Sequence, residues 1–342
     1  MRASVHAVPR RRPHESRFAG PRGASPTSRG ILTRMAEVGA SQNSVADDSN
    51  AAQATLSGVG RVLLGLLYLL PKNAMSRAMG RFASIAWPGP IQRAEIRLFA
   101  RLAGVDLSEA RDDVGDFATL QQFFTRALRP GARPIDGGED VLVSPCDGAW
   151  GAAGRIEGGT LLQLKGRTYR VADLLGHEAW AVDYEGGTYA TLYLSPRDYH
   201  RFHTPAAGRI TRLDYLPGAL WPVNAIGLLG IDGLFARNER ICAELLPDGS
   251  AAGPGLLMIA VGATMVGSVR LAFDELCTNV ADATPVTRRL ERNPPAFARG
   301  EEWGHFEFGS TIVLLAPPGG PRIEPRPVGT PVRLGEAIGR LR

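Results

Sequence analysis

The chain after Val141 consists of short β-prone runs separated by glycine and proline. The runs include VLVSP, TLLQLKG, ATLYLSP, LLMIAVGATMVGSVRL and STIVLLAP. Runs of this kind, bounded by turn residues, predict strands. Because strand and helix units do not alternate, a doubly wound nucleotide-binding sheet is disfavoured. We therefore expect residues 131–342 to form a mostly antiparallel β domain.

Residues 56–130 have a helical pattern in which apolar side chains accompany arginines. An apolar run of nine residues extends from Val62 to Leu70, which is far shorter than the roughly 20 residues that span a bilayer. Between residues 61 and 101 there are seven basic side chains and one acid, Glu95. Such helices suit the surface of an anionic membrane, and an ordinary helical subdomain packed on the β domain fits equally well. In both cases the fold class is α+β.

Residues 1–55 are rich in Arg, Pro, Ser, Gly and Ala without apolar periodicity, which predicts a disordered tail. The first 35 residues hold eight arginines and one acid, Glu15, so this stretch carries +7 and the rest of the chain −2. Its prolines would break the amphipathic helix of a transit peptide. We expect a flexible tail or a true start at Met35. Since the excess positive charge lies in this tail, we expect no nucleic-acid partner.

The cysteines are Cys146, Cys242 and Cys277. Because they are odd in number and far apart, they predict neither a disulfide framework nor a zinc-ligand pair. They fit a reducing cytoplasm. Lysine occurs only at Lys72 and Lys165, so few lysines could form a Schiff base with a carbonyl substrate.

Two turn segments carry side chains suited to acid–base chemistry. SPCDGAW places Asp147 before a glycine, where aspartate is more often a structural turn residue than a catalytic one. SPRDYHRFHTP holds His200 and His203 among charged residues. A His-x-x-His pair without a third ligand is a weak metal signal, so we expect no metal. A general base or a substrate contact is the better functional interpretation, although two surface histidines in a loop would give the same pattern.

The segment GEEWGHFEFGSTIVLLAP contains Gly309, Ser310 and Thr311 where a strand would be most regular. Gly-Ser in a strand is by default a bulge, and alternatively the serine is a nucleophile where the backbone can bend. The second glycine and the helix of a nucleophile elbow are missing, which disfavours an α/β-hydrolase. Asp147, His203 and Ser310 could act together as acid, base and nucleophile. Their spacing in the sequence does not say whether they meet in space.

These residues lie in segments that resemble the bacterial, membrane-associated phosphatidylserine decarboxylases, a family that depends on a pyruvoyl group. The similar segments are FFTRALRPGARPID, SPCDG, YHRFHTPAAGRI, LPGALWPVN, LFARNERI, VGATMVGSV and GEEWGHFEFGST. They follow the family order, and the resemblance extends from about Leu56 to the C-terminus. Phe308 departs from the usual motif, in which leucine is commoner, and we expect this to change the rate of processing without abolishing it.

The resemblance implies a proenzyme that cuts its own backbone between Gly309 and Ser310. The products would be a β chain (1–309) and an α chain (310–342), and Ser310 would become the pyruvoyl group at the start of the α chain. The aspartate and histidine that assist the cut in the family fall on Asp147 and His203. His203 would deprotonate Ser310, with Asp147 behind it, for attack on the carbonyl carbon of Gly309.

The resemblance also implies phosphatidylserine decarboxylase activity. The pyruvoyl carbonyl would form a Schiff base with the amine of phosphatidylserine and accept electrons as carbon dioxide leaves. His200 or His203 would then return a proton to give phosphatidylethanolamine. The family further implies membrane-associating helices in residues 56–130, an anionic membrane that holds the substrate, a homodimer, and a peripheral location on the cytoplasmic face of the cell membrane.

Two other hypotheses stay open at this point. A self-cleaving, membrane-associated serine peptidase would use Asp147, His203 and Ser310 and keep an intact serine at its new terminus. A membrane-bound β module without activity would stay uncut, although the presence of all three reactive side chains argues against it. The mass of the C-terminal fragment distinguishes both from the decarboxylase.

Overall fold

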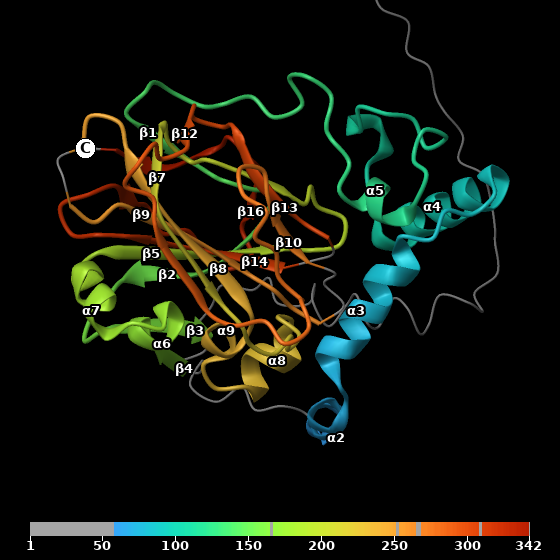
Figure 1. Cartoon of the computed structure of the whole chain (residues 1–342), viewed down its shortest axis with the longest axis horizontal. Coiled ribbons are helices and arrows are strands. Elements are labelled where there is room, and N and C mark those ends of the chain that lie inside the picture. Colours follow the sequence, from blue (N-terminus) through green and yellow to red (C-terminus); the bar gives the residue numbers. More distant parts are fainter. Residues whose placement is uncertain (1–57, 165–166, 251–252, 265–267, 308–309, 342) are drawn as a thin grey trace, which may run out of the picture. The chain divides into compact units, whose positions relative to one another are not determined.

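The computed structural model describes residues 58–164, 167–250, 253–264, 268–307 and 310–341. All of them belong to one compact unit, Asp47–Arg342, in which the longest helices come first along the chain and strands with a few short helices between them follow (Figure 1). The α+β class expected from the sequence is confirmed. The disorder expected for residues 1–55 lies outside the described residues, and the division into domains at residue 130 stays a prediction.

The longest helices of the described chain lie at its start. In chain order the helices are α2 (Gly58–Leu69), α3 (Lys72–Ala83), α4 (Gly89–Ala103), η2 (Leu107–Glu109), α5 (Leu120–Phe124), α6 (Val171–Leu175), α7 (Glu178–Ala181), η3 (Val182–Tyr184), α8 (Ala225–Gly230) and α9 (Leu234–Arg237), where η marks a 3₁₀ turn. α4 ends at Gly104, whose φ of 77° is the left-handed conformation that glycine adopts without strain. Thr119 begins α5 by accepting a hydrogen bond from the amide of Gln122, the usual role of a helix N-cap.

Strands dominate from Val141 onward. They are β1 (Val141–Val143), β2 (Gly148–Arg155), β3 (Thr160–Leu164), β4 (Arg167–Arg170), β5 (Thr188–Leu194), β6 (Arg201–His203), β7 (Gly208–Leu216), β8 (Arg240–Pro247), β9 (Leu256–Val261), β10 (Val269–Leu271), β11 (Val286–Arg289), β12 (Ala296–Phe297), β13 (Glu302–Phe306), β14 (Ser310–Ala316), β15 (Arg322–Ile323), β16 (Pro331–Val332) and β17 (Ala337–Arg340). Every ladder between these strands is antiparallel, as the sequence predicts.

One large sheet organises the β-rich part. Its strand order is β11-β7-β8-β9-β14-β5-β2-β16, and β12 also pairs with β7. Three smaller sheets accompany it, with the orders β1-β17-β15, β10-β13-β6 and β3-β4. Because β14 lies between β9 and β5, both of its edges are hydrogen-bonded to neighbouring strands.

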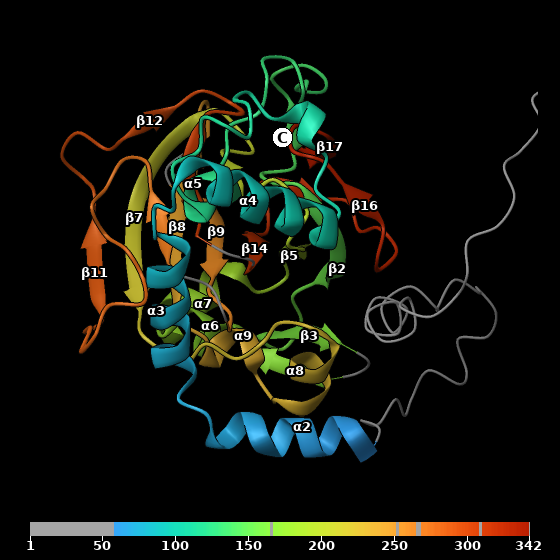
Figure 2. The ribbon, with the colours of Figure 1, turned by 90° about the vertical axis from the view of Figure 1, so that its right-hand side faces the viewer.

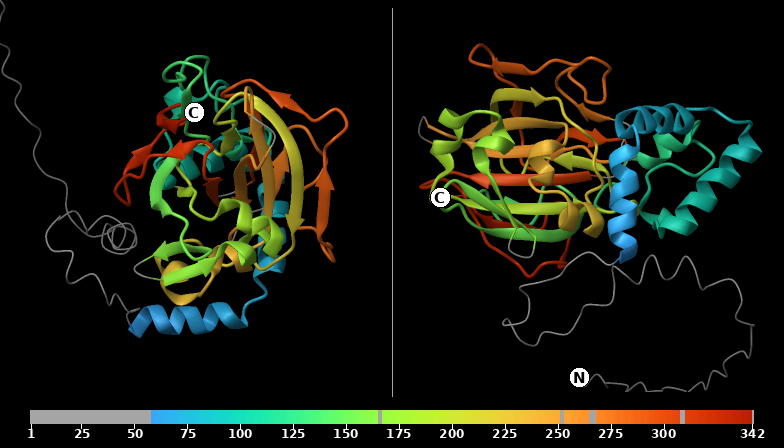
Figure 3. Two further views of the ribbon diagram at one scale, coloured as in Figure 1. Left: turned by 90° about the vertical axis from the view of Figure 1, so that its left-hand side faces the viewer. Right: turned by 90° about the horizontal axis from the view of Figure 1, so that it is seen from below.

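The central strand β14 is buried on both faces. Ile312 and Leu314 belong to one hydrophobic cluster, which Trp303 of β13 shares, whereas Val313 and Leu315 belong to a second cluster. α6, α7 and α9 cover the face of the second cluster (Figures 1 and 3). A strand that is buried on both faces needs apolar residues at every position, which explains the uninterrupted run IVLLA.

The helices α3, α4 and α5 pack beside one end of the large sheet (Figure 2). Ile96, Phe117 and Phe123 belong to a third cluster, built from the end of α3, from α4 and α5, and from the loop between α4 and α5. Arg201 of β6 fixes this cluster to the strands, because its Nε donates to the carbonyl oxygen of Thr125 at 2.9 Å. Figure 2 looks toward this end of the strands and shows α3, α4 and α5 in front of them.

Several large apolar side chains of the first helices face solvent. On α2 they include Leu66 and Leu69, and on α4 they include Ile91, Leu98 and Leu102. The three on α4 follow one another by seven and four residues, so they share one helix face. No helix within the described residues is both long enough and apolar enough to cross a membrane.

Candidate active site

Three chain segments that are far apart in the sequence meet at one end of the large sheet. Ser310 at the start of β14 pairs with Leu194 at the end of β5, and Tyr193 of β5 pairs with Ala149 of β2. Neighbouring strands lie about 4.8 Å apart, so the start of β2 lies about 10 Å from the start of β14. Asp147 directly precedes β2. The topology therefore brings Asp147 and Ser310 to the same end of the sheet.

Part of the expected cleavage site lies outside the described residues. This holds for Phe308 and Gly309. Of Ser310 the structure describes the backbone, which forms the first position of β14. The expected bulge or sharp bend at Gly309 therefore stays a prediction.

Gly148 allows β2 to approach β5 closely beside Asp147. A Cβ atom on Gly148 would lie 2.4 Å from the carbonyl oxygen of Tyr193 and 3.5 Å from the amide nitrogen of Leu194. The first distance is far below a normal contact between carbon and oxygen. The glycine of the Asp-Gly pair is thus required by the packing of two strands, and it places Asp147 at the sheet end.

Asp147 is buried and bound by a guanidinium. Arg133 donates from Nε to Oδ1 at 2.8 Å and from Nη2 to Oδ2 at 2.6 Å, and the amide of Leu334 donates to Oδ1 at 2.8 Å. Nη2 of Arg133 also contacts Glu109 at 2.7 Å. Burial alone would lower the pKa of Arg133, but the hydrogen bonds to Asp147 and Glu109 outweigh it, so the pKa is raised. Asp147 thus belongs to a row of three charged side chains in which Arg133 pairs with both Glu109 and Asp147.

His203 is oriented by a carbonyl group and a phenol. Its Nδ1 lies 2.9 Å from the carbonyl oxygen of Gly300, and its Nε2 lies 3.2 Å from Oη of Tyr199. Since a carbonyl oxygen only accepts, we assign the proton to Nδ1, which leaves Nε2 to accept from the Tyr199 hydroxyl. Burial lowers the pKa of His203, so the imidazole is neutral at neutral pH and Nε2 can serve as a base.

Asp147 and His203 are neighbours, although their side chains are not hydrogen-bonded to each other. The backbone amide of His203 donates to the carbonyl oxygen of Pro145 at 2.7 Å, two residues before Asp147. In the described chain, however, the side chain of His203 is hydrogen-bonded to Gly300 and Tyr199, and the side chain of Asp147 accepts from Arg133 and Leu334. The direct aspartate–histidine contact of a serine-protease triad is therefore not formed in this uncut chain.

His200 is a fully buried imidazole with one unpartnered nitrogen. Its Nδ1 lies 2.8 Å from the carbonyl oxygen of Asp198, whereas its Nε2 has no hydrogen-bond partner. The ring packs on Phe124 with 4.0 Å between ring centroids. Burial lowers the pKa of His200 to about 3. The ring is therefore neutral, and Nε2 carries a lone pair that would have to take up a proton before it could donate one.

The turn after β5 places His200 near the start of β14. Asp198 accepts hydrogen bonds from the amide and the hydroxyl of Ser195, both at 2.7 Å, which is the local bonding that favours aspartate in turns. The carbonyl oxygen of His200 then accepts from the amide of Phe306 at 2.9 Å. Phe306 lies four residues before Ser310, so His200 and the start of β14 belong to one region of the molecule.

The structure adds four residues that the sequence reasoning did not single out. They are Glu109, Arg126, Arg133 and Tyr199, which surround Asp147, His200 and His203 through the contacts described above and below. Both arginines lie in the segment FFTRALRPGARPID, and Tyr199 directly precedes His200. The position of Arg126, Arg133 and Tyr199 in these segments was the available sign of a functional role. The sequence does not show which side chains they contact.

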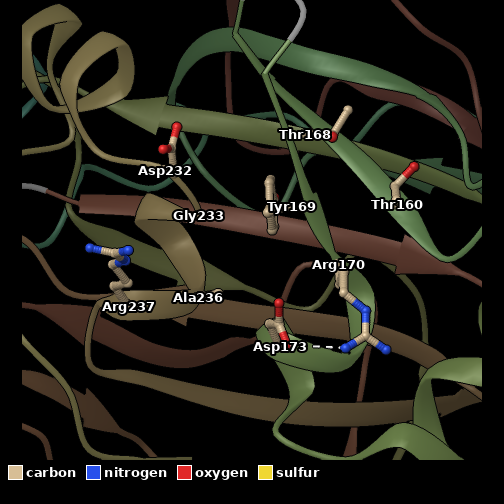
Figure 4. A pocket seen from close by; sticks show the side chains of 9 residues that line it. All are labelled: Thr160, Thr168, Tyr169, Arg170, Asp173, Asp232, Gly233, Ala236 and Arg237. Atoms are coloured by element: carbon tan, nitrogen blue, oxygen red, sulfur yellow. Dashed lines mark ion pairs between the residues drawn. The ribbon is translucent and has the colours of Figure 1, made fainter.

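A separate pocket of about 430 Å³ lies between β4, α6 and α9 (Figure 4), and neither His200 nor His203 lines it. Asp173 and Arg170 on its wall form an ion pair at 3.7 Å, so these charges already compensate each other. No group of three or more His, Cys, Asp and Glu side chains in the described part of the chain is arranged to hold a metal ion. The reactive groups thus concentrate at the sheet end rather than in the pocket.

Comparisons with known proteins identify relatives over most of the chain. The family model described as Phosphatidylserine decarboxylase matches residues 120–340, and a second model, described as PSD, matches residues 64–102. A phosphatidylserine decarboxylase proenzyme of Anaeromyxobacter sp. (strain K) is 47% identical over 82% of this chain and 98% of its own length. Proenzymes of the same name are 41% identical in Brevibacillus brevis, over 75% of this chain and 89% of the relative, and 43% identical in Acidovorax ebreus, over 79% and 94%.

Proposed function

The chain belongs to the phosphatidylserine decarboxylase family, and we propose that it is a proenzyme whose mature form converts phosphatidylserine into phosphatidylethanolamine and carbon dioxide. One observation carries the proposal. The family match covers Asp147, His200, His203 and Ser310, and the fold brings the segments that hold them to one end of the large sheet.

Maturation would begin with attack by Ser310 on the preceding peptide bond. His203 Nε2 would take the hydroxyl proton, the Oγ atom would bond to the carbonyl carbon of Gly309, and the C–N bond would break as the nitrogen gains a proton. The ester that results would lose the α-proton of residue 310 and release Gly309 as a carboxylate. Water would then replace the nitrogen of the remaining dehydroalanine, with loss of ammonia, to leave a pyruvoyl group. The neutral, buried imidazole of His203 supports its role as the base.

Tyr199 and Arg133 extend this proposal beyond the residues expected from the sequence. Tyr199 occupies Nε2 of His203 in the uncut chain, so its hydroxyl has to turn away or relay the proton before His203 can act on Ser310. Arg133 holds the Asp147 carboxylate. We therefore assign Asp147 to shaping the sheet end and balancing its charge rather than to a direct hydrogen bond with His203.

The neighbouring residues fit a pyruvoyl group at position 310. Such a group supplies a carbonyl that accepts the electrons released when carbon dioxide leaves. Thr311 is buried, and its hydroxyl has no hydrogen-bond partner. This hydroxyl is therefore an available hydrogen-bond donor one residue after position 310. His200 Nε2 is free as well, and we propose that it carries the proton which the product needs at Cα. Phe124, stacked on His200, would keep water from this face of the site.

We further propose that the protein works as a peripheral protein at an anionic membrane surface on the cytoplasmic side. The apolar face of α4, formed by Ile91, Leu98 and Leu102, is exposed, and the exposed Arg97 and Arg101 lie on the same helix. A helix of this kind can bury its apolar face among acyl chains while its cations meet anionic lipid. This arrangement would bring a phospholipid substrate to the adjoining end of the sheet. A homodimer is proposed from the family resemblance.

The experiment that tests the proposal is mass spectrometry of the C-terminal fragment from purified protein. A fragment of residues 310–342 that is lighter than its seryl form by one ammonia supports a pyruvoyl group. A free seryl terminus would indicate a peptidase, and an uncut chain would indicate an inactive module. Either of these two results contradicts the proposed function. Product formation from phosphatidylserine vesicles, measured as phosphatidylethanolamine, tests the second half of the proposal.

A further inference from the structure

Arg126 carries a buried charge without a counterion beside the candidate active site. It follows α5 and is 4% exposed. Its Nη2 donates to the carbonyl oxygen of Arg197 at 3.3 Å, while its Nε and Nη1 have no acceptor. Three N–H groups of this guanidinium are therefore unsatisfied in the described chain.

The nearest acids do not compensate this charge. Asp147 and Glu109 act on Arg126 only through longer-range attraction, and both are already paired with Arg133. An unpaired, desolvated guanidinium is unfavourable for a fold. Buried polar groups that lack partners in a native structure are uncommon, and they concentrate at sites that receive a ligand or store strain.

A second unsatisfied group lies next to Arg126. His200 packs on Phe124, two residues before Arg126, and its Nε2 is unpartnered. Two hydrogen bonds hold the end of α5 against the turn that carries His200: Arg126 donates to Arg197, and Arg201 donates to Thr125. A cationic donor and a neutral acceptor thus lie on two segments that these hydrogen bonds hold together.

We propose that Arg126 binds the phosphodiester of the substrate headgroup in the mature enzyme and so makes the enzyme select a phospholipid over a free amino acid. The assignment rests on the proposed function, because it takes phosphatidylserine as the substrate. The headgroup offers two anions, a carboxylate and a phosphodiester. A cation on the carboxylate would stabilise the ground state of a group whose charge must be lost, and so oppose decarboxylation. The phosphodiester keeps its charge throughout the reaction, and guanidinium groups match its oxygens well.

Access to Arg126 requires a change in the uncut chain, since its Nε and Nη1 are buried. The amide of Phe306 donates to the carbonyl oxygen of His200, so the segment that leads toward residue 309 is tied to this place. A cut between Gly309 and Ser310 separates that segment from β14. We therefore place headgroup binding after maturation.

The test measures ligand binding to mature protein by calorimetry rather than by activity. Three soluble amines are compared: glycerophosphoethanolamine, which has the phosphodiester; serine, which has the carboxylate; and ethanolamine, which has neither. The variants are Arg126→Gln and Arg126→Lys. Arg129→Gln is the matched control. Arg129 lies three residues later and is exposed, and its substitution removes the same charge. Mass spectrometry first confirms that each sample is cut.

Wild-type protein should bind glycerophosphoethanolamine about 10- to 100-fold more tightly than ethanolamine, as expected for one charge-assisted hydrogen-bonding group. Arg126→Gln should abolish this ratio and leave the serine-to-ethanolamine ratio unchanged, while Arg129→Gln should change neither. If Arg126→Gln is not cut, Arg126→Lys is measured in its place and should lower the ratio about tenfold. A ratio like that of wild type in the Arg126 variant overturns the proposal, as does a selective loss of the serine preference. A wild-type protein that binds glycerophosphoethanolamine no more tightly than ethanolamine also overturns the headgroup proposal, whereas the proposed function is tested separately by the fragment mass and by product formation.

Discussion

Replacing Arg133 with glutamine should leave the Asp147 carboxylate buried without its counterion. The change is best made in the Ser310→Ala background, where every chain stays full-length and maturation cannot alter the stability. Side chains of Arg133 and Asp147 are each 8% exposed, and their nitrogen and oxygen lie 2.6 Å apart. Breaking a buried pair of this kind by removing one partner costs about 3–5 kcal/mol.

Urea unfolding followed by tryptophan fluorescence measures this loss. With a slope of about 3 kcal/mol per M, the midpoint of Arg133→Gln should fall by roughly 1–1.7 M. The double variant Arg133→Gln, Asp147→Asn removes the charge that was left unpaired. It should therefore be more stable than the sum of the two single changes predicts, by about 2–3 kcal/mol. Arg111→Gln, which breaks an exposed ion pair with Asp112, is the control and should leave the midpoint unchanged.

Acid should reduce the difference between Arg133→Gln and its parent. The pKa of Glu109 is lowered, first of all by its hydrogen bond from Arg133. In the parent, the resulting stabilisation is complete above the unfolded pKa of about 4.3 and is lost as the pH falls through the lower folded value. The variant lacks this contribution at every pH. Additive single changes, or a variant as stable as its parent at neutral pH, would refute the view that Arg133 neutralises a buried carboxylate.

Four further outcomes follow from the site and its surroundings. The rate of self-cleavage should stay constant as the pH falls to about 6.5 and decline only below it, because burial lowers the pKa of His203; a decline that begins above pH 7, seen by gel electrophoresis, would contradict this. His203→Ala should remain uncut, whereas His200→Ala should be cut but form little phosphatidylethanolamine, and the reverse pattern would exchange their roles. Leu98→Glu should weaken sedimentation with anionic vesicles without slowing cleavage. Sedimentation equal to that of the wild type would contradict the proposal that α4 binds the membrane surface. Gly148→Ala should lower the thermal midpoint strongly, because its Cβ would lie 2.4 Å from the carbonyl oxygen of Tyr193, and an unchanged midpoint would mean that β2 can move.

Much of the architecture is readable in local patterns. Runs bounded by Gly and Pro indicate the strands, and the uninterrupted IVLLA segment is explained by burial of β14 on both faces. Helix ends are also local, as the left-handed Gly104 shows. These features depend on periodicity and on backbone preferences of single residues, which do not require knowledge of distant parts of the chain.

The family is likewise visible in the segments that hold Asp147, His203 and Ser310, and the comparisons confirm the membership. The sequence predicts which side chains are reactive, because their chemistry belongs to the residue type. The roles assigned to individual site residues stay predictions. Tests of these roles can be designed because the structure shows which groups each side chain contacts.

The tertiary structure alone decides which groups meet. Ladders between β2, β5 and β14 bring residues separated by more than a hundred positions to one sheet end, and no local pattern encodes that pairing. Packing also selects the partners: Asp147 binds Arg133 rather than His203, and Tyr199 occupies the base nitrogen of His203. The unsatisfied guanidinium of Arg126 becomes visible only when its surroundings are known. The sequence by itself thus determines the reactive groups and the strands that carry them, whereas long-range packing determines their distances, their burial and the charges that face them.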